Sequence, residues 1–145
     1  MGDKYDALKL ENQLCFLLYA TSKEVVRRYK PLLNELNLTY TQYITLLVLW
    51  EQKSLSVKEL GDFLFLDSGT LTPVLKALEK KGYISRQKSK KDERVLTVTL
   101  TESGMELKER AVHIPSKIAE CIEIDEEEAR KLFDILKKML DGFKL

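Results

Sequence analysis

Histidine and cysteine are scarce in this 145-residue chain, and their scarcity excludes several kinds of site. A single histidine, His113, cannot build a histidine-rich metal centre, and it leaves a Ser-His-Asp triad with one candidate base. The two cysteines, Cys15 and Cys121, are 106 positions apart, which fits neither a zinc-ligand pattern nor a secreted disulfide framework. We therefore expect neither a metal nor a cofactor.

Long hydrophobic runs are also missing. The longest apolar stretch, around residues 44–50, is far too short to cross a bilayer, and the first residues lack the apolar segment of a signal peptide. We therefore expect a cytoplasmic protein without a membrane partner. Hydrophobic residues make up 44% and charged residues 32% of the chain, which is typical of one folded domain over residues 1–145.

The spacing of the apolar residues predicts a mainly helical chain. A long first helix is predicted from Leu10, and Pro31 is expected to end it. A helix from Thr101 is expected to kink or break at Pro115. Capping boxes, in which the N-cap and N3 residues bond each other's backbone N–H groups, predict three further helix starts. They are Thr39 with Gln42, Ser56 with Glu59, and Asp125 with Glu128.

The middle of the chain has the order of a helix-turn-helix. The helix that opens at Ser56 is followed by a turn at residues 67–69 and by a second helix that ends at Gly82. The start of this second helix is ambiguous, because Pro73 would break a helix already formed five residues earlier. Either the helix opens at Ser68 with an irregular first turn, or its cap is Thr70 or Thr72.

A hairpin is predicted directly after this pair of helices. Alternating apolar residues favour strands at residues 84–89 and 94–100, and the connector between them is charged and must be exposed. Two helices followed by a hairpin predict a winged helix-turn-helix, mainly α with a small β-hairpin. The N- and C-terminal helices carry more apolar residues than so small a head can cover, so we expect them to form a dimer.

Charge is unevenly distributed along the chain. Residues 76–94 contain eight basic and three acidic residues, which is +5 in a chain with a net charge of +1. The excess falls on the second helix and the hairpin, where DNA phosphates would lie. A solvated surface is the alternative explanation for a charge run taken alone.

Two segments resemble a known family. Asp92-Glu93-Arg94 followed by Leu100-Thr101 resembles the D-x-R … L-T wing signature of MarR-type winged-helix repressors. Residues 67–73 resemble the opening of the recognition helix in the organic hydroperoxide-resistance branch, and residues 11–19 match near the N-terminus. The likeness extends in outline over nearly the whole chain. It implies an obligate homodimer on a palindromic, double-stranded DNA operator.

The resemblance also implies which residues contact DNA. The expected major-groove residues are Ser68, Thr70, Thr72 and Lys76. Short hydroxyls and a lysine at a helix N-terminus suit contacts with phosphates and base edges. In the wing, Asp92 would orient Arg94 toward the narrow, electronegative minor groove. The remaining expected wing contacts are Lys88, Lys90 and Lys91.

Cys15 is expected in the middle of an apolar helix, where cysteine is ordinarily buried and inert. Tyr19, four residues on, lies on the same helical face. The resemblance implies that Cys15 is instead reactive, and that Tyr29 and Tyr40 donate hydrogen bonds that favour its nucleophilic thiolate. Tyr29 is about 21 Å further along the same helix, so it would have to reach the partner's cysteine. Ordinary interface packing is the alternative for both tyrosines.

Cys121 indicates which of two subtypes of the family this chain resembles. Relatives with one cysteine stop at a sulfenic acid and need a low-molecular-weight thiol, whereas two-cysteine relatives carry a resolving cysteine near this position. The position of Cys121 places the chain in the second class, with a disulfide to Cys15 of the other subunit. The alternative is an incidental cysteine near a helix end.

The sequence therefore predicts a redox-sensing repressor that binds DNA when reduced and is released when organic hydroperoxide oxidises Cys15. One alternative is a MarR-type repressor that senses a phenolic or aromatic ligand without cysteine chemistry. Another is a thiol peroxidase, for which the sequence contains no motif. The main prediction excludes an enzyme.

Overall fold

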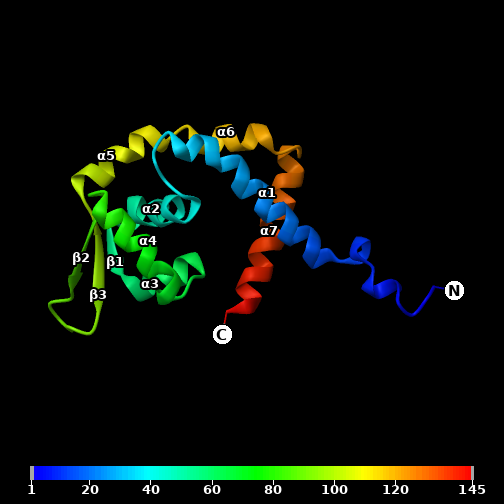
Figure 1. The fold of residues 1–145 in the computed structure, drawn as a ribbon, viewed down its shortest axis with the longest axis horizontal. Coiled ribbons are helices and arrows are strands. Elements are labelled where there is room, and N and C mark those ends of the chain that lie inside the picture. The colour runs from blue at the N-terminus through cyan, green and yellow to red at the C-terminus, as the bar shows by residue number, and fades with distance from the viewer. Residues whose placement is uncertain (1, 145) are drawn as a thin grey trace.

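The computed structural model describes residues 2–144 of the chain (Figure 1). The helices are α1 (Leu14–Asn34), α2 (Tyr40–Gln52), α3 (Val57–Leu64), α4 (Ser68–Lys80), α5 (Glu102–Ala111), α6 (Ile114–Cys121) and α7 (Glu126–Phe143). The strands are β1 (Ser54–Ser56), β2 (Ile84–Lys88) and β3 (Leu96–Leu100), and two 3₁₀ turns, η1 (Asp6–Leu8) and η2 (Leu10–Asn12), precede α1. The order from α2 to β3 is that of a winged helix-turn-helix, as predicted.

The first long helix differs from the prediction at both ends. It begins at Leu14 rather than Leu10, because the side-chain amide of Gln13 donates to the carbonyl oxygens of Ala7 (2.6 Å) and Lys9 (2.8 Å) and stabilises the preceding 3₁₀ turns. The helix also continues past Pro31 to Asn34. Pro31 lies near the end of α1, where the missing N–H removes one bond without breaking the helix. The predicted start at Leu10 and end at Pro31 are therefore wrong.

The predicted helix starts are confirmed elsewhere. All three capping boxes form, and their N-cap residues are Thr39, Ser56 and Asp125. The helix expected to break at Pro115 ends at Ala111, and α6 begins with Pro115 in its first turn. These features depend on residues within one turn of each other, which is why the sequence shows them.

The sheet has three antiparallel strands in the order β1–β3–β2. The predicted hairpin is present, and Arg86 of β2 lies opposite Val98 of β3. The short strand β1 was not predicted: Leu55 pairs with Val98 on the other side of β3. Its three residues become a strand through pairing with a segment more than forty residues away, and so short a stretch has no alternating pattern of its own.

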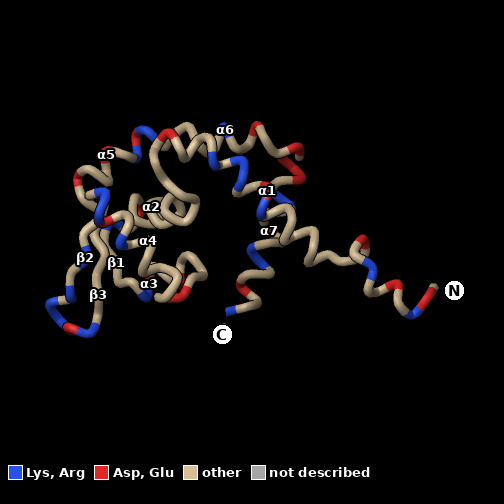
Figure 2. Tube along the Cα trace, viewed as in Figure 1, with Lys and Arg blue, Asp and Glu red and all other residues tan. Residues whose placement is uncertain are grey.

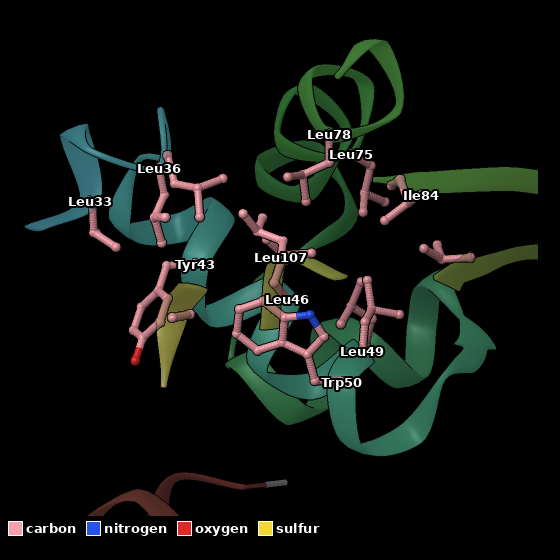
Figure 3. Packing of buried hydrophobic residues seen from close by; sticks show 14 of the residues in the cluster. Leu33, Leu36, Tyr43, Leu46, Leu49, Trp50, Leu75, Leu78, Ile84 and Leu107 are labelled. Atoms are coloured by element: carbon pink, nitrogen blue, oxygen red, sulfur yellow. The ribbon is translucent and has the colours of Figure 1, made fainter. Parts of the chain in front are cut away.

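The hydrophobic core fills the space between α2, the helix-turn-helix and the sheet (Figure 3). Leu46 and Leu49 of α2 are completely buried, and Leu78 of α4 packs into the same cluster. Trp50 joins α5 to this core, because its indole N–H donates to the carbonyl oxygen of Gly104 (2.9 Å). This core fixes α4 and the hairpin relative to each other.

The two ends of the chain are poorly covered. Helix α7 follows α6 and lies on the side of the molecule away from the sheet (Figure 1). None of its residues is buried in the described chain, although it is strongly amphipathic. Leu14, Leu17 and Phe133 are more than half exposed. This distribution agrees with the expectation that the terminal helices pack against a second subunit.

Candidate nucleic-acid interface and cysteine site

Helix α4 is the second helix of the helix-turn-helix and the candidate recognition helix. Its N-cap is Asp67, whose carboxylate accepts the backbone N–H of Thr70 at 2.7 Å. This hydrogen bond lowers the pKa of Asp67, so the cap remains charged at neutral pH. The helix opens at Ser68 and accommodates Pro73, so a cap at Thr70 or Thr72 is ruled out.

The end of α4 is equally well defined. Gly82 has φ = 83°, and its N–H donates to the carbonyl oxygen of Glu79, while the N–H of Tyr83 donates to that of Leu78. These two bonds make a Schellman motif, which turns the chain directly into β2. Gly82 therefore ends the helix as the sequence indicates.

The residues expected in the major groove lie along α4, three of them in its N-terminal half and Lys76 beyond its middle. Ser68, Thr70 and Lys76 are exposed. Thr72 is half-buried, and its hydroxyl donates to the carbonyl oxygen of Ser68 at 2.7 Å. That bond uses the Thr72 proton, so this hydroxyl offers an outside group an acceptor rather than a donor.

The connector between β2 and β3 forms the wing. Both oxygens of Asp92 accept hydrogen bonds from the guanidinium of Arg94, each at 3.2 Å, and Oδ1 also accepts the backbone N–H of Arg94 at 3.0 Å. These bonds lower the pKa of Asp92. The side chain of Arg94 is nevertheless 90% exposed. Asp92 therefore orients a cation that projects from the tip of the wing.

Basic residues gather on the wing, as the charge distribution predicted (Figure 2). Lys88, Lys90 and Lys91 are exposed. Arg86 is an exception within the basic segment, since its guanidinium donates to Glu79 of α4 at 3.1 Å and its side chain is 18% exposed. This pair, which also lowers the pKa of Glu79, joins α4 to β2 and contributes no free positive charge.

Cys15 lies at the second position of α1, not in the middle of a helix as expected. It is exposed in the single chain. Cys15 lies near the helix end because α1 starts later than predicted, and the residues before Leu14 form 3₁₀ turns. Tyr19, one turn further along α1, is also exposed, and Lys23 lies over its ring with 4.9 Å between the ammonium nitrogen and the ring centroid.

Tyr29 and Tyr40 lie together. Their ring centroids are 4.9 Å apart, and Tyr43 completes the cluster at 5.7 Å from Tyr29. Burial raises the pKa of Tyr29 to about 12, and the neighbouring phenols act in the same direction. Burial likewise raises the pKa of Tyr40. Both phenols therefore keep their protons, and can donate hydrogen bonds, throughout the neutral pH range.

This tyrosine cluster cannot reach Cys15 of the same chain. Cys15 and Tyr29 lie on one continuous helix, and fourteen residues of helix span about 21 Å. The structure thus places the two phenols together and separates them from the chain's own thiol.

Cys121 is the last residue of α6 and is exposed. Its thiol donates to the carbonyl oxygen of Lys117 at 3.5 Å. It lines a shallow hollow between α6 and the middle of α1, where its neighbours include Thr21, Val25 and Arg28. Cys15 is not among the residues of this hollow, and both thiols are free.

Sequence reasoning missed two contacts that hold the recognition helix α4 in place. The Glu79–Arg86 pair couples α4 to the wing, and Lys81 donates to Asn37 in the loop before α2 and to Gln42 within α2. Each contact joins residues on different elements, so local spacing gave no signal for it.

Among residues 2–144, no helix combines the length and apolar character needed to cross a membrane, and no cluster of His, Cys, Asp or Glu is arranged to hold a metal ion.

A capped recognition helix, a hairpin with an oriented arginine and a basic tip define a winged-helix transcriptional regulator. Residues 27–111 match the family model described as transcriptional regulator SarA/Rot. The organic hydroperoxide resistance transcriptional regulator of Bacillus subtilis is 51% identical over 141 residues, which is 97% of this chain and 96% of that protein.

Solved structures of AbfR from Staphylococcus epidermidis are also similar. Reduced AbfR bound to DNA has a TM-score of 0.78 at 35% identity, with 97% of this chain and 98% of that chain covered. Disulfide-formed AbfR has a TM-score of 0.63 at 35% identity, with 96% and 94% covered. The chain belongs to the MarR-type winged-helix regulators, in the organic hydroperoxide-resistance branch. Its relatives are regulators and not enzymes, so the thiol peroxidase alternative is wrong.

Proposed function

We propose that this protein is a redox-sensing repressor: its homodimer binds a palindromic operator when reduced and leaves it when an organic hydroperoxide oxidises Cys15. The observation that carries the proposal is that one chain combines a basic winged-helix face with an exposed thiol at the start of α1. The Bacillus subtilis relative, described as an organic hydroperoxide resistance regulator, supports this class of oxidant.

The dimer follows from the uncovered apolar surface. Leu8, Leu14 and Leu17 at one end of the chain, and Phe133 and Phe143 of α7, are each more than half exposed. Soluble chains rarely expose so many large apolar side chains on terminal helices. A two-fold dimer presents the same surfaces on both subunits, so the two sets can cover each other.

The conformation supports a DNA-binding role for this chain. Its TM-score is 0.78 against reduced AbfR bound to DNA, 0.78 against overoxidized AbfR bound to DNA and 0.63 against disulfide-formed AbfR. The likeness therefore follows the DNA-bound conformation and is lower for the disulfide form. In the proposed complex, Ser68, Thr70, Thr72 and Lys76 enter the major groove. The wing residues Lys88, Lys90, Lys91 and Arg94 contact the backbone and minor groove, and Asp92 holds Arg94 in place.

The proposed chemistry at Cys15 is a two-electron oxidation. The thiolate attacks one peroxide oxygen, the O–O bond breaks, an S–O bond forms, and the alkoxide leaves and takes up a proton as an alcohol. The start of α1 suits an anionic sulfur, because the first backbone N–H groups of a helix lack intrahelical acceptors. The apolar side chains of Leu14, Phe16 and Tyr19 around it would favour an alkyl hydroperoxide over hydrogen peroxide.

Contacts across the dimer complete the proposed site. If the two α1 helices run antiparallel, Cys15 of one subunit meets the Tyr29–Tyr40 cluster of the other, which the chain's own thiol cannot reach. The sulfenic acid then condenses with the thiol of Cys121 from the other subunit, which forms an S–S bond and releases water. This bond would move the recognition helices away from the spacing of about 34–36 Å that two half-sites require.

A DNA-binding experiment tests the proposal. A palindromic duplex is selected from a random library with the reduced protein and is then used in gel-shift titrations. We expect binding by the reduced protein, release after stoichiometric cumene hydroperoxide, and recovery after dithiothreitol. Binding that is unaffected by the hydroperoxide would contradict the proposal.

The wing arginine gives a second test. Arg94→Ala is expected to lower the DNA affinity by about tenfold or more, because it removes a cation that Asp92 holds in an exposed position. It should also lower the slope of log affinity against log salt concentration by about one. The dimer should remain intact, since the wing is remote from the terminal helices. Loss of dimer instead would mean that the wing is misassigned.

A second candidate function follows from a hollow beside the tyrosine cluster. Lys23, Arg27 and Lys30 line it together with apolar side chains such as Val26 and Leu38, which suits an amphipathic acid. A ligand-sensing repressor would use this hollow and leave Cys15 inert. Alkylation of the thiols with iodoacetamide distinguishes the two functions, because a ligand-sensing repressor would still be released by its ligand after alkylation.

A further inference from the structure

The recognition helix is tied to the joint between α1 and α2 by a lysine. Lys81 directly follows α4 and is half-buried. Its ammonium donates to the side-chain oxygen of Gln42 at 2.9 Å and to the backbone carbonyl oxygen of Asn37. These acceptors are 39 and 44 residues away in sequence, so the bonds join two separate parts of the fold.

Both acceptors belong to the α1–α2 corner, residues 35–42, which internal hydrogen bonds hold together. Gln42 is buried, and its side-chain oxygen also accepts the backbone N–H of Thr39, while its own N–H donates to the Thr39 hydroxyl, each at 3.2 Å. Asn37 is held in the left-handed conformation, with φ = 55°. The next residue, Leu38, is bonded back to Leu33 of α1. A displacement of this corner therefore moves the acceptors of Lys81 together.

The same corner carries the tyrosine cluster. Tyr40 is the first residue of α2 and lies between the two residues of the capping box that Lys81 contacts. Its ring packs against Tyr29 of α1 and against Tyr43 one turn further along α2. In the proposed function these phenols donate to the partner's thiolate, and oxidation replaces that anionic acceptor with a neutral sulfenic acid and then with a disulfide. The first backbone element to respond would be the start of α2.

The bonds of Lys81 differ in kind from the other contacts between α2 and α4. Leu75 and Leu78 of α4 pack into the core beside Leu46 of α2, and such apolar contacts have no preferred direction. Hydrogen bonds from an ammonium are directional and lose strength when an acceptor moves by an ångström. Burial also lowers the pKa of Lys81, which agrees with a cation partly removed from water.

We propose that Lys81 is a positioning residue that couples the tyrosine cluster at the α1–α2 corner to the recognition helix. This proposal rests on the proposed function and assigns the route by which oxidation of Cys15 reaches α4. A change at the phenols shifts the capping box of α2, and the shared acceptors Gln42 and Asn37 transmit the shift to the end of α4.

The test compares Lys81→Met with Lys80→Met. Both variants remove one positive charge from the end of α4, and for the side chain of Lys80 the described residues 2–144 show no hydrogen bond or ion pair. For each variant, the DNA affinity is measured in the reduced state and after cumene hydroperoxide, and the loss of free thiol is timed. The ratio of the reduced to the oxidised DNA affinity measures the coupling. A substitution that weakens DNA binding equally in both states leaves this ratio unchanged.

In Lys81→Met we expect the ratio of reduced to oxidised affinity to fall about fivefold or more from its wild-type value. In Lys80→Met it should change by less than about twofold. The rate of thiol loss should be the same in both. If Lys81→Met keeps the ratio of Lys80→Met, Lys81 is not a coupling residue.

Gln42→Glu provides a conservative variant, since a carboxylate still accepts from Lys81 and Thr39. It should keep the wild-type ratio, and a loss of coupling here would contradict the proposed route. Unfolding monitored through Trp50 fluorescence verifies that each variant is folded. Failure of the proposed function has a different signature, because wild-type protein and Lys80→Met would then also stay on DNA after hydroperoxide, and the coupling role would fall with it.

Discussion

Cys15→Ser is expected to bind the selected duplex as tightly as the wild-type protein and to remain bound after hydroperoxide. Serine has nearly the size of cysteine. Position 15 is exposed in the single chain and faces the partner's phenols in the proposed dimer, so the exchange creates no cavity and leaves the hydroxyl with hydrogen-bond partners. A hydroxyl cannot be oxidised by a peroxide under these conditions, so the S–O bond that begins the proposed response cannot form. Gel-shift titrations before and after cumene hydroperoxide measure the effect, which should be a complete loss of release.

The matched control is Cys121→Ser, which removes the other thiol and keeps Cys15. Release of Cys15→Ser by hydroperoxide would place the sensor at another residue. Equal loss of DNA binding by both serine variants in the reduced state would show a structural effect of the exchange rather than a redox one.

The second large effect concerns covalent linkage between subunits. Oxidised wild-type protein is expected to run as a dimer on non-reducing denaturing gels, and dithiothreitol should return it to monomer. A disulfide needs Cα atoms within about 7 Å of each other. Within one chain, Cys121 lies in a hollow against the middle of α1, and Cys15 is not among the residues of that hollow. In the proposed dimer, an antiparallel partner helix would bring the other subunit's Cys15 past that region. Peptide mapping should find Cys15 joined to Cys121.

Cys121→Ser should abolish the covalent dimer almost completely. Its sulfenic acid at Cys15 then has no resolving thiol in the protein, so stable release should require an added low-molecular-weight thiol, and excess peroxide should overoxidise the sulfur to sulfinic acid. If oxidised wild-type protein instead stays monomeric on the gel and carries a small-thiol adduct at Cys15, the single-cysteine mechanism replaces the two-cysteine one.

Local chemistry explains why much of the fold could be predicted from the sequence. The capping boxes at Thr39, Ser56 and Asp125 join residues three positions apart, and the Schellman end at Gly82 needs one residue with positive φ. The wing pair Asp92–Arg94 is also local, since it spans two positions. Each of these features could be predicted because the interacting residues are close together in the sequence.

The errors have different causes. Strand β1 exists because Leu55 pairs with Val98, which is distant in the sequence. Helix α1 begins late because Gln13 bonds Ala7 and Lys9, and the spacing of apolar residues does not show this local contact. The charge count of residues 76–94 includes Arg86 as a basic residue available to DNA, but its guanidinium forms an ion pair with Glu79 of α4. The expected roles of Tyr29 and Tyr40 came from family resemblance, and nothing in their spacing indicates that their rings lie 4.9 Å apart. The arrangement of two subunits lies outside what one chain's sequence pattern can give.

The uncovered helix α7 has a consequence for how much protein a cell needs. None of its residues is buried within one chain, so in the proposed dimer the pairing of subunits stabilises this helix. The proposed palindromic operator is contacted by two recognition helices, one from each subunit. Wherever monomers predominate, the amount of dimer rises with the square of the total concentration, so a twofold change in synthesis alters the pool of DNA-binding protein about fourfold. Dilution alone would therefore relieve repression, without any oxidant.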